Sequence, residues 1–161
     1  MRTLRTVPIS AEAFAPYGEL IEAPVEPGRT YFDRALCNRR DGVACSLSVA
    51  HIAPAAEQPL IATRMERHEF SSQTFLPLLV GSYVVVVADH GSSGGPDVAT
   101  ARAFLVQGHQ GITYAVNTWH HPMTVLGGPA RSAVLMWRDG GPGDEEFVTL
   151  SEPLRVTVDI L

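Results

Sequence analysis

The sequence predicts an all-β fold, a sandwich or a barrel, with one short helix near the N-terminus. The chain has 161 residues, which is about the length of one domain, so residues 1–161 are expected to form a single unit. Its 14 glycines and 12 prolines divide it into short segments, and short segments favour strands over helices. Strand-like segments recur between glycine turns, which is typical of all-β sandwiches and barrels.

The helix is predicted directly after Ser10, a residue type that caps helix N-termini well. Residues 11–15 continue it for barely two turns, and Pro16 and Gly18 end it. The predicted strands are residues 20–21, 43–52, 65–69, 73–80, 83–88, 102–106, 112–116, 123–126, 132–137, 147–150 and 155–160. The glycine-rich stretch 91–96 is the clearest loop between them.

Three of these segments carry a more specific expectation. In residues 43–52, every second residue from Val43 to His51 forms a mostly apolar face, which is expected to be half-buried. Residues 83–88 are apolar on both faces and are expected to form a central strand. The apolar tail, residues 156–161, either closes a barrel or pairs with a second subunit.

The basic side chains are all arginine, because the 12 positive residues include no lysine. This composition excludes a Schiff-base lysine, a phosphate-loop lysine and a lysine general base. The 17 acidic residues give a net charge of -5, which disfavours a nucleic-acid binder. The expected partners are therefore a small-molecule substrate and a second copy of the chain.

The two cysteines, Cys37 and Cys45, have no metal-ligand spacing and are expected to be reduced thiols of a cytoplasmic protein. The first residues lack the apolar segment of a signal peptide. The longest apolar run, residues 83–88, is far shorter than the roughly 18 residues of a membrane helix. No membrane association is expected.

Two polar clusters combine ionisable side chains with strand context. In the first, Glu66 and His68 alternate onto one face of a strand, and Gln73 lies on the next strand. The second is residues 117–122, where His120 and His121 must point to opposite faces of a strand. The clusters flank the strand at residues 83–88, and we expect them to meet in one cavity.

A divalent metal ion is one hypothesis for this cavity. Glu66, His68 and His120 are ligand types that such ions accept, whereas Gln73 would be a weak neutral ligand. The histidine pair that small metal-binding barrels commonly present is reduced here to one histidine. The sequence therefore leaves a metal open and indicates no organic cofactor.

Both clusters belong to a longer ordered pattern that resembles the ureidoglycolate lyase family. The pattern consists of Phe14-x2-Tyr17-Gly18, Glu66-Arg67-His68-x4-Gln73-x-Phe75-x-Pro77, residues 83–88, Arg102-Ala-Phe104, and Gly111-x2-Tyr114-x2-Asn117-x-Trp119-His120-His121-Pro122. The resemblance covers most of the chain. It implies a cupin-like (jelly-roll) β-barrel, usually homodimeric, that splits (S)-ureidoglycolate into glyoxylate and urea in the allantoin branch of purine degradation.

The family resemblance also bears on the metal. Nickel has been associated with some members, so nickel is the metal expected if one is bound. Some members carry a histidine where this chain has Ala115, and this chain must work without it.

Elimination of urea from this substrate needs a base for the hydroxyl proton and an acid for the departing nitrogen, and histidine suits both. We expect His68 and His120 to transfer protons or bind the metal, with His121 in reserve. Glu66 is expected to orient His68 or to bind the metal.

The remaining residues of the pattern are expected to bind the substrate. Arg67 and Arg102 offer bidentate forks for its carboxylate. The ureido group presents donors and acceptors that suit Gln73, Tyr114 and Asn117. Trp119 is expected to line the cavity.

Two other readings of the sequence stay open. One is another cupin activity, such as a metal-dependent isomerase or dioxygenase. The other is a non-catalytic module that binds a small acid, because the same barrel serves as a ligand-binding domain.

Overall fold

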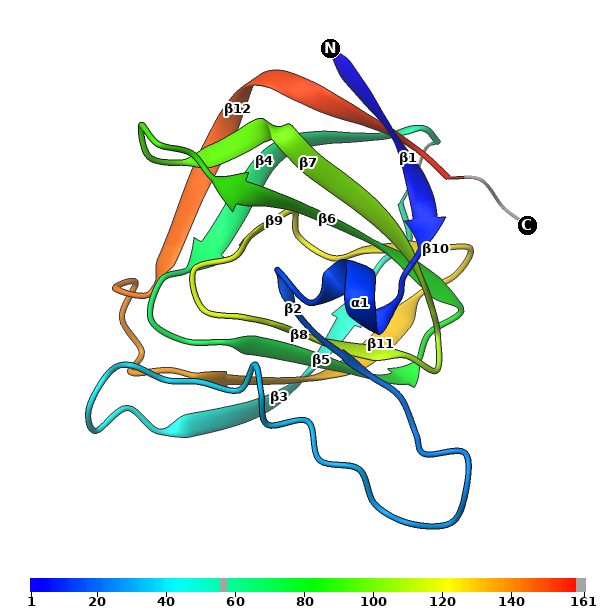
Figure 1. The fold of residues 1–161 in the computed structure, drawn as a ribbon, viewed down its shortest axis with the longest axis vertical. Coiled ribbons are helices and arrows are strands. Elements are labelled where there is room, and N and C mark those ends of the chain that lie inside the picture. The colour runs from blue at the N-terminus through cyan, green and yellow to red at the C-terminus, as the bar shows by residue number, and fades with distance from the viewer. Residues whose placement is uncertain (56–57, 159–161) are drawn as a thin grey trace.

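Two β-sheets make up almost all of the structure, a computed structural model that describes residues 1–55 and 58–158 (Figure 1). The elements are β1 (Arg2–Pro8), α1 (Ala11–Phe14), β2 (Gly18–Ile21), β3 (Cys45–Ile52), β4 (Leu60–His68), β5 (Gln73–Leu79), β6 (Ser82–His90), β7 (Pro96–Gln107), β8 (Gly111–Tyr114), β9 (Trp119–His120), β10 (Thr124–Leu126), β11 (Ala130–Trp137) and β12 (Glu145–Thr157). The sheet orders are β10-β6-β7-β1-β12-β4-β9 and β2-β8-β5-β11-β3.

The larger sheet closes on itself. Strand β9 pairs with β4 through Glu66 and His120, and it also pairs with β6 through Val87 and His120. Six strands, in the order β6-β7-β1-β12-β4-β9, therefore form a closed barrel. Its interior is filled by apolar side chains, which include Leu4, Ala62, Met65, Val84, Val86, Ala103, Trp119, Leu154 and Val156.

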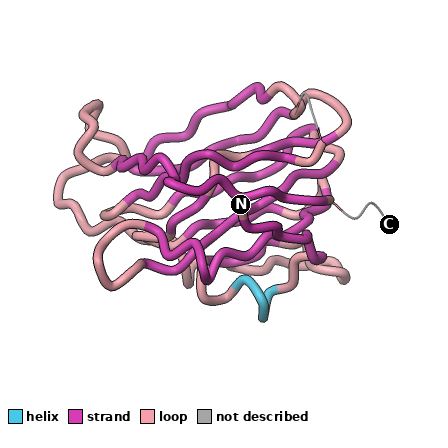
Figure 2. Tube along the Cα trace, turned by 90° about the horizontal axis from the view of Figure 1, so that it is seen from above, coloured by secondary structure: helices cyan, strands magenta, loops and turns pink. Residues whose placement is uncertain are grey.

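The smaller sheet packs against the outside of this barrel and creates a second core. Alternate residues of β6 supply both cores, because Val84 and Val86 point into the barrel whereas Val85 and Val87 point towards the smaller sheet. The strand is thus buried on both faces, as the sequence predicts for residues 83–88. Figure 2 shows the stacked strands with α1 lying along one side.

Helix α1 fits the sequence prediction and covers one end of the second core. The side chain of Ser10 accepts a hydrogen bond from the backbone N–H of Ala13, which caps the helix. Phe14 is fully buried and packs edge-on against Phe104 and Tyr114, with ring centroids 5.9 and 6.1 Å away. The helix therefore also supports the aromatic ring that borders the polar cluster described below.

The prediction of an all-β, cupin-like barrel with a short N-terminal helix is confirmed. The predicted strands overlap observed strands, although residues 147–150 and 155–157 belong to one strand, β12. Residues 159 and 160 of the last predicted strand lie outside the described residues. Strand β1 was not predicted. It pairs in parallel with β7 and β12, and this pairing depends on distant segments that have no local signature.

The prediction of which face of strand β3 is buried is wrong. Leu47 and Val49 are 69% and 64% exposed, and the opposite face, which includes Ile52, turns inward. Ile52 packs on the second core, and the two-residue period of a strand then turns Leu47 and Val49 outward. The alternation was recognised correctly, but the choice of face depends on the packing partner.

The tail, residues 156–161, is the other prediction that the fold addresses. Val156 and Thr157 belong to β12, which pairs with β1 and β4 and so contributes to closing the barrel. Residues 159–161 lie outside the described residues.

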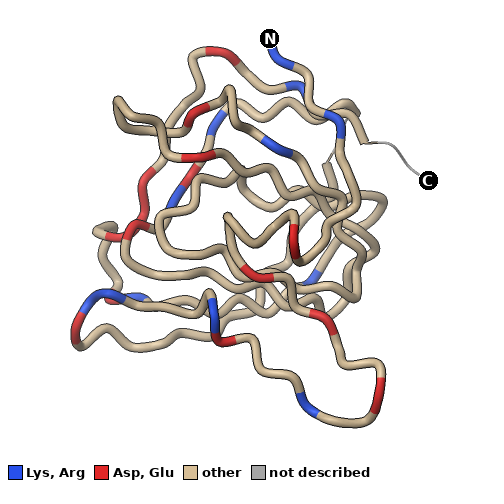
Figure 3. Tube along the Cα trace, in the orientation of Figure 1, with Lys and Arg blue, Asp and Glu red and all other residues tan. Residues whose placement is uncertain are grey.

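Positive and negative side chains are interspersed along the chain (Figure 3). Within the described residues, no helix is long and apolar enough to span a membrane.

Candidate active site

The structure brings the two polar clusters together on the outer face of the barrel, where the smaller sheet covers it. Glu66 and His120 are directly opposite each other on β4 and β9, and Glu66 Oε1 lies 3.3 Å from His120 Nε2. The ring of His68, two residues further along β4, is centred 5.9 Å from that of His120. Asn117 donates its backbone N–H to the carbonyl oxygen of His68 at 2.7 Å, which ties the turn before β9 to the end of β4.

The smaller sheet adds Tyr114 and Gln73 to this cluster. Tyr114 on β8 stacks on His120, with ring centroids 3.9 Å apart. Gln73 is paired with Tyr114 across β5 and β8, and its amide nitrogen lies 4.0 Å from the sulfur of Met136. β-sheet register thus holds Glu66 opposite His120 and Gln73 beside the tyrosine that stacks on His120.

Several buried polar atoms of this cluster have no hydrogen-bond partner within the protein. They are both ring nitrogens of His68, Oε1 of Gln73, the hydroxyl of Tyr114 and Nε2 of His120, whose 3.3 Å approach to Glu66 is an ion-pair contact. Each unpaired buried group of this kind costs roughly 1–3 kcal/mol. Unsatisfied polar atoms that gather in one place are the arrangement expected where a polar ligand completes the hydrogen bonds.

The two ring nitrogens of His120 have different surroundings. Its Nδ1 is 2.9 Å from the carbonyl oxygen of Thr118, which can only accept, so Nδ1 carries a hydrogen. Its Nε2 lies 3.3 Å from Oε1 of Glu66, within ion-pair distance. The carboxylate and the Nε2 side of the ring are therefore close enough to exchange a proton.

The pKa values of Glu66 and His68 are both lowered, which favours a charged carboxylate and a neutral imidazole. For Glu66, burial raises the pKa. The close contact with His120 and the charges of His120, His68 and Arg64 lower the pKa by more, so the net pKa is below its usual value. Burial lowers the pKa of His68, and the charge of His120 lowers it further. Burial raises the pKa of Tyr114 well above its usual value, so its hydroxyl keeps its hydrogen.

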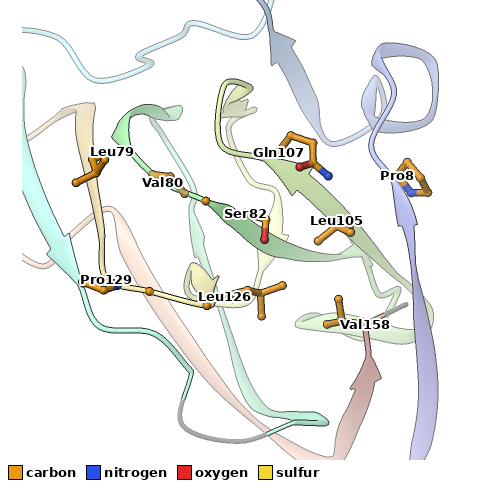
Figure 4. A pocket seen from close by; sticks show the side chains of 12 residues that line it. Pro8, Leu79, Val80, Ser82, Leu105, Gln107, Leu126, Pro129 and Val158 are labelled. Atoms are coloured by element: carbon orange, nitrogen blue, oxygen red, sulfur yellow. The ribbon is translucent and has the colours of Figure 1, made fainter. Parts of the chain in front are cut away.

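A polar cavity of about 170 Å³ opens next to His68. Its lining consists of Arg40, His68, Gln73, Met136, Trp137, Arg138, Asp139, Gly141, Asp144 and Glu145. A larger cavity, of about 870 Å³, is lined mainly by apolar residues such as Leu105, Leu126 and Val158 and by no ionisable side chain (Figure 4). Of these two cavities, the smaller one is the candidate active site, because ionisable side chains line it.

Three residues of the pattern point away from His68 and His120. Arg67 and Trp119 occupy the alternate positions of β4 and β9, and Asn117 lies in the turn between β8 and β9. Trp119 fills the barrel interior, and its indole N–H donates to Nδ1 of His90 at 3.0 Å. The Arg67 guanidinium lies over Trp119, 4.9 Å from the ring centroid, and donates to the side-chain oxygen of Asn117 and, at 2.7 Å, to Glu146. These three residues form a separate group at the end of the barrel.

The structure also separates Arg102 and His121 from the cluster. Arg102 is exposed, donates to the carbonyl oxygen of Ala13 at 3.3 Å and is divided from His120 by strand β6. The ring of His121 lies 2.9 Å from the carbonyl oxygen of Arg64.

Sequence reasoning missed Arg40 and Asp144, which line the polar cavity beside His68. Both lie in segments without regular structure, and neither belongs to a recognisable local pattern. Only the long-range contact between these two segments shows their position.

The cluster does not have the arrangement of a metal site. Within the ranges 1–55 and 58–158, no three His, Cys, Asp or Glu side chains are close enough together to hold an ion. Glu66 and His120 are donor types that suit a divalent ion, but here they face each other, and Gln73 is a weak ligand. We therefore assign no chemical step to a metal.

Among solved structures, the chain is similar to a dTDP sugar isomerase from Desulfovibrio desulfuricans, with a TM-score of 0.49, 17% identity and 83% of each chain covered. It is also similar to oxalate decarboxylase from Lactobacillus farciminis, with a TM-score of 0.42 and 15% identity, covering 83% of this chain and 31% of that one.

The sequence comparisons are more extensive. A ureidoglycolate lyase from Burkholderia mallei is 34% identical over 169 residues, covering 100% of this chain and 97% of that protein. A ureidoglycolate lyase from Pseudomonas aeruginosa is 35% identical over 165 residues, covering 96% and 95%. The family model described as Ureidoglycolate lyase matches residues 1–157. The chain therefore belongs to the ureidoglycolate lyase family.

Proposed function

We propose that this protein is a ureidoglycolate lyase that converts (S)-ureidoglycolate into glyoxylate and urea, as one catalytic unit spanning residues 1–161. The observation that carries the proposal is the buried cluster in which His68, whose pKa is lowered by burial, stands near the Glu66–His120 pair. The reaction needs one group that accepts a proton and one that donates it, and this cluster provides both. Its place in metabolism is then the allantoin branch of purine degradation.

In the proposed mechanism, His68 is the general base. Its unpartnered ring nitrogen takes the proton of the substrate hydroxyl as the carbon–oxygen double bond of glyoxylate forms. The carbon–nitrogen bond breaks with its electron pair moving to nitrogen, and the Glu66–His120 pair delivers a proton to that nitrogen. Urea and glyoxylate leave, and one proton transfer from His68 to the pair restores the starting state.

The ureido group is proposed to bind between the two sheets. Gln73 Oε1 is an unpartnered acceptor for its N–H groups, and the Tyr114 hydroxyl is an unpartnered donor for its carbonyl oxygen. For the substrate carboxylate, the arginines in the wall of the cavity are Arg40 and Arg138. They replace Arg67 and Arg102 in the proposal, because those two arginines point elsewhere.

The first test is turnover of (S)-ureidoglycolate, measured as urea and glyoxylate released per enzyme. We expect His68→Ala and His120→Ala each to lower kcat by about 10²–10⁴-fold, because each removes a proton-transfer group. His109→Ala is the matched control, since His109 is exposed and lies in the turn between β7 and β8.

Normal turnover by folded His68→Ala and His120→Ala would refute the assigned roles, and ammonia release without urea would refute the lyase reaction. Binding without turnover by the unmodified protein would favour a binding module instead.

The pH dependence of kcat/KM provides a second test. His68 must be neutral to act as a base, and its pKa lies below the ordinary 6.5, so activity should fall only as the pH drops below about 6.5. The unfolded chain binds more protons than the folded chain in this range, so the free energy of unfolding should also decrease as the pH falls through 6.5. Urea unfolding at several pH values should show a smaller decrease for His68→Gln. An acid limit of kcat/KM well above pH 6.5 would contradict His68 as the base.

The metal question has its own test. We propose that proton transfer by protein groups carries the reaction, and we expect kcat to stay unchanged after exhaustive chelation and dialysis, with metal content measured by mass spectrometry. Nickel is the metal that the family resemblance indicates. Loss of activity on chelation that nickel restores, while manganese and buffer do not, would overturn this expectation and establish a nickel enzyme.

We also propose that the protein is a cytoplasmic homodimer. Its two cysteines are free thiols, which fits a reducing compartment. The outer face of the smaller sheet carries an apolar patch, defined here as Leu47, Val49, Leu76, Ala133 and Leu135, in which Leu47 pairs with Leu135 and Val49 pairs with Ala133. An exposed apolar face of this kind is typical of a subunit interface.

Charge placed in this patch should dissociate the dimer. We expect Leu47→Glu to elute as a monomer with light-scattering detection, because the patch would then have to bury a carboxylate. Val25→Glu is the control, because Val25 is 98% exposed and lies outside the patch. A Leu47→Glu protein that stays dimeric would place the interface elsewhere, and a monomeric unmodified protein would contradict the dimer.

A further inference from the structure

We propose that Asp144 is a positioning residue that sets the geometry of His68 and Gln73, an inference that rests on the proposed function. Asp144 precedes β12 and is 7% exposed. It lies in the wall of the polar cavity, and its side-chain hydrogen bonds go to Phe70, Ser71 and Arg40, not to His68 or His120. Its role is exerted through the turn, residues 69–72, that joins the end of β4 to the start of β5.

The contacts of Asp144 converge on this turn. Its Oδ1 accepts a hydrogen bond from the backbone N–H of Phe70 at 2.6 Å, and its Oδ2 accepts one from the hydroxyl of Ser71. Its backbone carbonyl oxygen accepts a hydrogen bond from the N–H of Glu69 at 3.1 Å. One buried residue thus binds three consecutive residues that directly follow His68.

The segment around Arg40 holds the same turn from its other side. Arg40 Nη2 lies 3.2 Å from Asp144 Oδ2 and donates to the carbonyl oxygen of Trp137 at 2.9 Å. Arg39 donates its backbone N–H to the carbonyl oxygen of Phe70, and Ser72 donates its own to the carbonyl oxygen of Cys37. Asp144 therefore connects the turn to the arginine that anchors this segment.

The turn determines where two reacting side chains lie. His68 and Gln73 directly precede and follow it, at the ends of β4 and β5. Both ring nitrogens of His68 and the Oε1 of Gln73 lack partners, so hydrogen bonds to these atoms do not fix the two side chains. Their placement depends on the backbone, and errors of about 1 Å in placement cost up to about 10²-fold in rate.

Asp139 offers a matched comparison. It also pairs with Arg40, at 2.9 Å from Nη1, but its side chain is 44% exposed. It accepts a hydrogen bond from the backbone N–H of Gly141 and not from the turn. Removing Asp139 therefore tests the loss of an Arg40 ion pair alone. Removing Asp144 tests the ion pair and the turn together.

The experiment compares the steady-state kinetics of Asp144→Ala, Asp144→Asn and Asp139→Ala with (S)-ureidoglycolate. We expect Asp144→Ala to lower kcat by about 10–10²-fold with a smaller change in KM. Asp139→Ala should lower kcat less than Asp144→Ala does, because it leaves the hydrogen bonds to the turn in place. Asp144→Asn should recover part of the loss, because its amide oxygen can accept from Phe70 and its NH2 group can donate to Ser71, although that group cannot accept from Arg40. A purely global loss of stability would lower the folded fraction without this split or this rescue.

Two results would overturn the proposal: an unchanged kcat in folded Asp144→Ala, or an equal loss in Asp139→Ala. If Asp144→Ala does not fold, Ser71→Ala removes one of the same bonds and should lower kcat in the same direction, and its full activity would count against the proposal.

A readout without substrate separates this proposal from the proposed function. The backbone N–H of Phe70 should exchange with solvent faster, and the ring NMR signals of His68 should shift, in Asp144→Ala but not in Asp139→Ala. If the unmodified protein does not turn over ureidoglycolate, the proposed function fails, and these two signals still decide the positioning role. Unchanged signals in Asp144→Ala refute it.

Discussion

Strand β9 is only two residues long, yet its pairing with β4 on one side and β6 on the other closes the barrel. Because adjacent strand residues point to opposite faces, Trp119 enters the barrel interior while His120 faces the smaller sheet. The same pairing places His120 opposite Glu66, the two residues to which the proposed mechanism assigns the proton donor. The pairing that closes the barrel is thus also the pairing that brings Glu66 and His120 together. A shift in its register would open the barrel and separate these two residues.

Strand alternation is also the reason that part of the site could be predicted from the sequence. The rule correctly placed Glu66 and His68 on one face and separated His120 from His121. The same rule, applied to Arg67 between Glu66 and His68, excludes Arg67 from the cavity. Arg67 is the neighbour of Glu66 on β4, and Trp119 is the neighbour of His120 on β9. The Arg67 guanidinium lies over the Trp119 ring, so both of these neighbours point away from the site.

Other parts of the structure depend on contacts that no local pattern encodes. Arg40 and Asp144 are far apart in the sequence. They are in contact because Asp144 lies in the connection between β11 and β12, which packs beside the segment that contains Arg40. The parallel pairing of β1 and the outward face of β3 have the same origin, since packing partners decide them. Periodicity predicts that a strand has two faces, whereas the tertiary structure decides which face is buried.

The absence of lysine limits how the protein could bond covalently to glyoxylate. Glyoxylate is an aldehyde, and the only primary amine available to form an imine with it is the N-terminus. In the structure this amine pairs with Glu152 on β12, away from the end of that strand where Glu145 is opposite His68. In the proposed mechanism, the two similar rings of His68 and His120 take the roles of base and acid. Their surroundings differ in the way that this division needs, because burial lowers the pKa of His68 and favours its neutral ring, whereas His120 lies beside the Glu66 carboxylate.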